Sequence, residues 1–148
     1  MTIPTESNSE AMRRLDVELF IVHPTLSVAQ ITTALGLEAH STHDVGHDRK
    51  TPKGTPLPGQ YRDTRWRYSI HHQISDQWFG DKIAAFVLVL TPHKTFLHQV
   101  RASGGSAQII VQFFGDGYLA DTLPLETLAS IAELQLDFGI EVFSVPQT

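Results

Sequence analysis

The sequence predicts an α+β fold: a mostly antiparallel sheet of about four to six strands with helices packed against it. Three observations indicate this fold. Some segments alternate apolar and polar residues, as strands with one buried face do. Others repeat apolar residues at spacings of three and four, as amphipathic helices do. Turns rich in Gly and Pro separate the two kinds of segment, and each apolar face needs a second layer to cover it.

The first two elements are a strand and a short helix. The strand is expected over residues 15–23, because its apolar residues alternate. The helix is expected over Ser27–Leu35. Ser27 is a good N-cap because its hydroxyl can accept a backbone N–H, and Gly36 suits the left-handed residue that closes a helix. The alternating residues of the strand are Leu15, Val17, Leu19 and Ile21.

The middle of the chain predicts two strands around a loop. Residues 38–47 are polar and suggest an extended return strand. Residues 49–60 contain three prolines and two glycines, which predicts a long loop that is either functional or disordered. Residues 64–72 form the clearest two-faced strand. Trp66, Tyr68 and Ile70 occupy one face of it, and Arg65, Arg67, Ser69 and His71 occupy the other.

Residues 83–90, IAAFVLVL, fit either a helix or a buried strand. A helix starting at Lys82 is favoured, because Asp81 stands where a cap should be and two alanines are poor strand formers. Pro92 breaks or restarts this helix, and a second helical segment runs to about Ala102.

The last third predicts a strand, a helix and a closing strand. They cover 107–114, the segment PLETLASIAEL with Pro124 at its start, and 138–145. Ser103-Gly104-Gly105 and Asp116-Gly117 predict turns. This order echoes that of residues 15–48, so we expect two strand–helix–strand halves in one sheet around a central strand and a long helix.

Composition narrows the class of protein. The chain has 148 residues, which predicts one domain over 13–148 after a polar, disordered tail over 1–12. It has no cysteine, which excludes disulfides, thiol nucleophiles and cysteine-ligated metals. The longest apolar run is eight residues, too short to span a membrane, and residues 1–12 do not resemble a secretory signal. We therefore expect a soluble cytoplasmic protein.

Charge is distributed unevenly. Between His47 and Arg67 the local net charge is +4, whereas after Arg101 there is no Lys or Arg and the local net charge is −6. An acidic third repels phosphates, so we expect no nucleic acid there, and it attracts a basic protein. The acidic candidates for partner binding are Asp116, Asp121, Glu126, Glu133, Asp137 and Glu141.

The order and spacing of several segments resemble a bacterial family catalogued as domain of unknown function 4279. The segments are LSVAQITTALGL, VGHD, TRWRYS, VLTPHKTF and LETLASIAELQLDFGIEVF, and they cover nearly the whole chain after Leu15. The family name implies no activity and supplies no catalytic motif. Association of some members with toxin–immunity loci implies an inhibitory or interaction role.

Histidines and carboxylates offer two candidates for chemistry. A group at His40, His43, Asp44, His47 and Asp48 would have metal-ligand spacing on a helix, but extended backbone splits it between two faces. We therefore predict no metal and no cofactor.

His71 could act with Asp63 or Asp76 in acid–base chemistry, although nothing in the sequence orients one group against the other. Sequence motifs for phosphate, dinucleotide and nucleophile-elbow sites are absent. The sequence therefore favours a protein without enzymatic activity.

Two tryptophans need separate interpretations. Trp66 lies among arginines and could stack on an anionic ligand, but the alternation favours a core position for it. Trp78 and Phe79 precede the long helix, where they either pack on the core or anchor a partner.

The sequence therefore predicts a non-catalytic protein-binding domain that covers a basic partner with its acidic third, in the manner of an immunity protein that neutralises a toxin. The alternative is a small-molecule or anion-binding domain, with or without catalysis, that uses the basic loop 49–67 and nearby histidines. Its candidate residues are Arg49, Lys53, Arg65, Trp66, Arg67 and His71.

Overall fold

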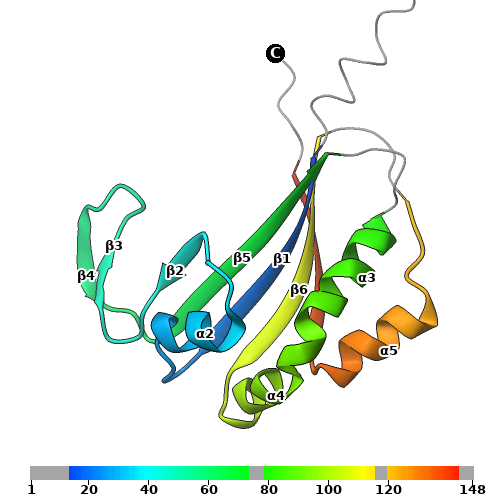
Figure 1. Cartoon of the computed structure of the whole chain (residues 1–148). Helices are drawn as coiled ribbons and strands as arrows, with labels where there is room; N and C mark the ends of the chain where they lie inside the picture. The colour runs from blue at the N-terminus through cyan, green and yellow to red at the C-terminus, as the bar shows by residue number, and fades with distance from the viewer. Residues whose placement is uncertain (1–13, 74–78, 116–119, 144–148) are drawn as a thin grey trace, which may run out of the picture.

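The computed structural model describes residues 14–73, 79–115 and 120–143. Its centre is a five-stranded sheet in the order β2-β5-β1-β6-β7 (Figure 1). Every neighbouring pair is antiparallel except β6 and β7, which are parallel. The expected α+β fold with a mostly antiparallel sheet is confirmed. The strands are β1 (Arg14–His23), β2 (Ser41–His43), β5 (Thr64–Gln73), β6 (Ser106–Phe114) and β7 (Asp137–Phe143).

The described helices all pack on one face of the sheet, which we call the helix face (Figure 1). Leu15, Val17, Leu19 and Ile21 of β1 point to it and form one cluster with the apolar stripes of the helices. The opposite side, the open face, carries Asp16, Glu18 and Phe20 from the same strand, because successive side chains alternate. The helices are α2 (Val28–Leu35), α3 (Phe79–Leu90), α4 (Lys94–Ala102) and α5 (Leu125–Glu133).

Trp66 lies in the core, as the alternation of β5 predicts. Its side chain is fully buried on the helix face, and its indole N–H donates to Oγ1 of Thr32 at 3.0 Å. Tyr68 follows it along the strand and stacks between Trp66 and Phe86. The alternation therefore separates Trp66 from the arginines of its own strand.

The caps of α2 are confirmed. Ser27 and Gln30 form a capping box, and Gly36 closes the helix at φ +67°. Asp44 adds a bond that the sequence did not predict: its Oδ1 accepts from the N–H of Val28 at 2.7 Å. The residue directly after β2 is thus fastened to the start of α2.

The long apolar segment is a helix, but Asp81 is not its cap. The helix α3 starts at Phe79, and the N–H of Gly80 donates to Oδ2 of Asp121 at 2.8 Å. Asp121 lies far along the chain, so this bond ties the approach to α5 to the start of α3. The 3₁₀ turn Thr91–His93 contains Pro92 and links α3 to α4, as expected.

Two predictions in the middle of the chain are wrong. The return strand is short, because β2 covers only Ser41–His43, and residues 49–60 are not a loop. Instead β3 (Asp48–Lys50) and β4 (Pro56–Gln60) pair as a separate antiparallel hairpin. The hairpin is exposed on both faces, so it shows no apolar alternation, and Gly59 within β4 has φ +85°. It projects from the β2 side of the sheet, away from α3 and α5 (Figure 1).

Both strand–helix–strand halves contribute to one sheet, but they are built differently. The strands β6 and β7 are neighbours, joined through α5. The strands β1 and β2 are not neighbours, because β5 lies between them. The strand β1 has two strands on either side and is the central strand of the sheet.

Phe79 packs edge-on against Phe113 with 5.3 Å between ring centroids, which favours its role as a contact with the core. The tail 1–12, Asp76, Trp78, the Asp116-Gly117 turn and the end of the closing strand lie outside the described residues. Among the described helices, none combines the length and the apolar character needed to cross a membrane.

Candidate functional site

Arg67 is held in a fixed position on the open face. Its Nη1 lies 3.2 Å and 3.3 Å from the two carboxylate oxygens of Glu18, and its guanidinium lies 3.7 Å from the centroid of the Phe20 ring. Glu18 is almost fully buried on the central strand, so desolvation raises its pKa, while the charge of Arg67 opposes that rise. A buried carboxylate and an aromatic ring together orient this arginine.

Asp16 forms a second cluster on the same face. It pairs directly across the strands with His71, and its Oδ1 lies 2.8 Å from Nδ1 of His71. Nε of Arg14 lies 3.1 Å from the same oxygen, and the Arg14 guanidinium lies over the Phe114 ring. Asp16 is 3% exposed, and neither of these contacts gives Oδ1 good hydrogen-bond geometry.

The carboxylate beside His71 is therefore Asp16, and neither predicted partner occupies that place. Asp63 instead lies near His43 and Arg65, and Asp76 is outside the described residues.

Ser69 occupies the open face between Arg67 and His71. Its hydroxyl oxygen lies 3.3 Å from Nε2 of His40, a residue just before β2. Nδ1 of His40 lies 3.0 Å from the carbonyl oxygen of Arg67, which also accepts the backbone N–H of His40. The open face thus carries two imidazoles, one hydroxyl and two oriented arginines.

A pocket of about 700 Å³ lies between β2 and the hairpin. Here the His43 ring stacks on Tyr61 with 3.7 Å between centroids, and the Tyr61 hydroxyl donates to the carbonyl oxygen of Lys50. The pocket is lined by Thr42, His43, Asp44, Gly46, His47, Asp48, Lys50, Gln60 and Tyr61.

The predicted histidine group separates in the structure. His40 faces Ser69, whereas the remaining members line this pocket. Across the described residues no three His, Asp or Glu side chains converge as metal ligands would.

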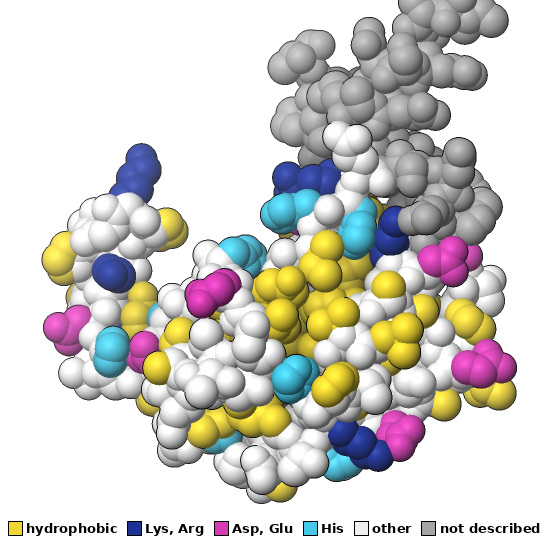
Figure 2. All heavy atoms as spheres, viewed as in Figure 1, with side chains coloured by type: hydrophobic (Ala, Val, Ile, Leu, Met, Phe, Trp, Pro, Cys, Tyr) yellow, Lys and Arg dark blue, Asp and Glu magenta, His cyan; other side chains and the backbone are white. Residues whose placement is uncertain are grey.

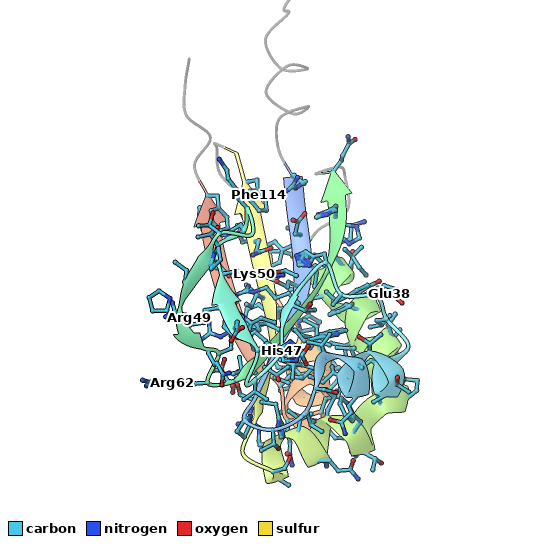
Figure 3. All side chains as sticks on the ribbon, turned by 90° about the vertical axis from the view of Figure 1, so that its left-hand side faces the viewer. Glu38, His47, Arg49, Lys50, Arg62 and Phe114 are labelled. Carbon is cyan, nitrogen blue, oxygen red and sulfur yellow. The ribbon has the colours of Figure 1, made fainter. Side chains whose placement is uncertain are left out.

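The basic candidates belong to two places. Arg65, Arg67 and His71 lie on the open face, with Trp66 behind them in the core. Arg49 and Lys53 belong to the hairpin. Figure 3 shows Arg49, Lys50 and Arg62 in this region, and Arg62 points away from the protein. We call four basic residues the hairpin cations: Arg49, Lys50 and Lys53 of the hairpin, and Arg62 just after it. None of them has an acidic partner among the described side chains.

The acidic candidates do not form one face. Asp121 binds the start of α3, and Glu141 lies on the open face. Glu133 accepts from Lys94 at 2.6 Å, a hydrogen bond that lowers the pKa of Glu133, and Asp137 pairs with Arg101 at 3.2 Å. Glu126 is exposed on α5 and has no ion-pair partner in the described part of the chain. Asp116 lies outside the described residues.

Several exposed apolar side chains lie on α3 and α5. Leu125 on α5 is 76% exposed and Leu88 on α3 is 73% exposed, and these two helices pack against each other. Leu128 is exposed one turn after Leu125. Figure 2 shows hydrophobic and acidic side chains next to one another over α3 and α5, on the right of the view. We call Leu88, Leu125, Glu126 and Leu128 the α3–α5 surface.

The arrangement of these segments matches a known family. A family model described as "Domain of unknown function (DUF4279)" matches residues 11–143. The chain belongs to the DUF4279 family. The match covers all the described elements, so the resemblance expected from the sequence is confirmed. No curated protein and no solved structure matches this DUF4279 chain.

Sequence reasoning missed the two buried carboxylates of the open face. Asp16 and Glu18 alternate with leucines and valines in β1, which is typical of a solvated outer face. A detectable signal was the second alternation in β5, where Arg67 and His71 provide two groups able to pair with carboxylates. Only the register of β1 against β5 shows which groups meet.

Proposed function

We propose that this DUF4279 domain is a protein-binding domain that docks a basic partner on the α3–α5 surface, with no chemistry at that surface. The observation that carries the proposal is that Leu125 and Leu128 are both exposed, with the unpaired Glu126 following Leu125 on the same helix. Exposed apolar groups beside like charges are typical of surfaces that bury apolar anchors inside a charged rim. For a basic partner, the negative charge of Glu126 would speed the encounter at low salt.

A toxin-neutralising, immunity-type role in the cytoplasm is the specific form of this proposal. An inhibitor of this kind needs no reaction of its own, because covering a basic surface with apolar anchors and opposite charge is sufficient for inhibition. The support for that form is the family resemblance together with the unpaired Glu126 beside the exposed leucines.

The test is affinity capture from a lysate of the organism that makes the chain, with three versions of the full chain as bait. These are the natural chain, the double variant Leu125→Ser/Leu128→Ser, and Leu57→Ser as a matched control. Leu57 is an exposed leucine of the hairpin. Burying two leucines contributes about 3 kcal/mol, so the double variant should bind on the order of 10²-fold more weakly.

A stoichiometric basic protein held by the natural chain and the control, and lost from the double variant and at high salt, is the expected result. A partner that the double variant retains at full strength would place its binding site elsewhere.

A second candidate function is binding of a small anion at the hairpin. The pocket of about 700 Å³ favours it, because Lys50 and two histidines line it beside Asp44 and Asp48, and the hairpin cations lack acidic partners in the described structure. Thermal-shift screening with inorganic phosphate and simple dicarboxylates tests this function. Lys50→Ala should abolish any stabilisation that the natural chain shows, whereas a shift that survives this change argues against the pocket.

A further inference from the structure

The centre of the open face places a hydroxyl between two imidazoles and a guanidinium. Arg67, Ser69 and His71 are alternate residues of β5, so they share one face at spacings of roughly 7 Å. His40 approaches Ser69 from the segment before β2. This group lies on the opposite side of the sheet from the helices and takes no part in the α3–α5 surface.

The surroundings of His40 determine which ring nitrogen carries the proton. Nδ1 faces the carbonyl oxygen of Arg67 at 3.0 Å, and a carbonyl can only accept. Nδ1 in the neutral ring must therefore be the N–H, which leaves Nε2 as the lone-pair nitrogen. Nε2 lies 3.3 Å from the hydroxyl oxygen of Ser69, so the hydroxyl donates to it. A serine beside an imidazole that a third group orients is the arrangement that activates a nucleophile.

His71 lies on the other side of Ser69 along β5. Its Nδ1 is 2.8 Å from Oδ1 of the buried Asp16, a contact without good hydrogen-bond geometry. His40 is therefore the imidazole whose contacts orient it toward Ser69.

Glu18 pairs directly with Ser69 across the strands, and this carboxylate is neutralised by Arg67, two residues before Ser69. Nη1 of Arg67 is engaged with Glu18, whereas no described residue accepts from Nε or Nη2. Because Phe20 and Glu18 fix the guanidinium, these remaining N–H groups are oriented before any ligand arrives.

We propose that Ser69 is a nucleophile activated by His40, and that the open face cleaves small activated carboxylic esters through an acyl–serine intermediate. In the first step, Oγ of Ser69 bonds to the acyl carbon, its proton passes to Nε2 of His40, and the carbon–oxygen bond to the leaving alcohol breaks. The alcohol leaves with that proton. Water then bonds to the acyl carbon and gives a proton to Nε2 of His40, the bond between the acyl carbon and Oγ of Ser69 breaks, the carboxylic acid leaves, and Oγ takes the proton back from His40.

This chemistry goes beyond the proposed binding function and is independent of it. The α3–α5 surface takes no part in the reaction, so the double variant Leu125→Ser/Leu128→Ser should keep the full reactivity of Ser69. Failure of either proposal leaves the other standing.

The direct test is labelling of the full chain with a fluorophosphonate, followed by peptide mass mapping. The reagent forms a bond between Oγ and phosphorus while the phosphorus–fluorine bond breaks, fluoride leaves, and the proton goes to His40. The expected result is one phosphonyl group on Ser69. A general base contributes on the order of 10²-fold or more, so His40→Gln should slow this labelling by about that factor.

Two controls separate reactivity from folding. Ser130→Ala removes a helix hydroxyl that donates to a backbone carbonyl, so labelling of Ser69 should not change. Circular dichroism and the urea midpoint show whether His40→Gln and Ser69→Ala are folded. Hydrolysis of p-nitrophenyl acetate should disappear with Ser69→Ala. A folded natural chain without an adduct on Ser69, or with the same labelling rate in folded His40→Gln, overturns the proposal.

Discussion

Replacing Arg67 with Met tests the energetics of the open face. The change keeps a long stem over the Phe20 ring but removes the charge that faces Glu18. Glu18 is 1% exposed, so its carboxylate cannot recover the lost interaction from water. The folded protein must then either hold an unpaired buried charge or keep Glu18 protonated.

The size of the effect follows from burial of the two partners. Breaking a buried ion pair by removing one partner costs about 3–5 kcal/mol. The side chain of Arg67 is 32% exposed, so water already screens part of this pair. We therefore expect Arg67→Met to lower the free energy of unfolding by about 3 kcal/mol near neutral pH.

The dependence on pH has a definite sign. Burial raises the pKa of Glu18 above its usual value of 4.5, and losing Arg67 raises it further. The folded state therefore keeps this proton to higher pH than the unfolded state does. The stability cost of Glu18 is absent below pH 4.5 and grows as pH rises through the folded pKa. The deficit of the variant should accordingly be small at about pH 5 and largest at about pH 8.

Urea unfolding followed by circular dichroism, at both pH values, measures the deficit. Arg65→Met is the matched control, because Arg65 is half exposed and pairs with Asp63 near the surface. This control should cost less than about 1 kcal/mol and show little dependence on pH. A deficit below about 1 kcal/mol for Arg67→Met at high pH, or one that does not grow with pH, would refute the reasoning.

Three further predictions concern the scaffold. Burial lowers the pKa of His23 below 6.5, and its Nδ1 accepts two backbone N–H groups, so the stability of the protein should fall as pH drops below 6.5. In His23→Gln, urea unfolding should show a shallower fall of stability with pH, and an equal slope would contradict this cause. Trp66→Ala should lose about 3–5 kcal/mol by the same assay, because the indole is fully buried; a loss below about 1 kcal/mol would argue against its core position. Asp121→Ala should cost about 1 kcal/mol and speed hydrogen exchange at Gly80, because the acceptor of its N–H is removed; unchanged exchange would contradict this role.

The sequence predicts elements well where one face is buried. The alternation in β5 places Trp66 in the core and Arg67 and His71 on the other face, and the caps Ser27 and Gly36 delimit α2. In each case the physical signal is local, because burial of one face or a single cap is encoded within a few residues.

Contacts between distant segments could not be predicted in the same way. Asp81 satisfies the local rule for a cap, but Asp121 makes the bond to Gly80. Likewise, the sequence offers Asp63 and Asp76 as partners of His71, and only the register shows that it pairs with Asp16. Such choices depend on which strands are neighbours, and the pattern within each strand does not carry that information.

The hairpin escaped prediction for a different reason. Its strands bury nothing, so they lack apolar alternation, and Pro56 and Gly59 are residues that usually argue against a strand. The acidic third was misleading in a similar way. Proximity along the chain suggested one acidic face, but the helix and strand geometry directs Glu126 and Glu141 to different surfaces.

The most direct test of the proposed function is hydrogen exchange on the complex of this chain with its captured basic partner. The α3–α5 account predicts that binding slows exchange in residues 125–133 and in the second half of α3, while exchange in the hairpin stays unchanged. Slower exchange confined to residues 48–60, with α5 unaffected, would contradict the account and identify the hairpin as the binding surface.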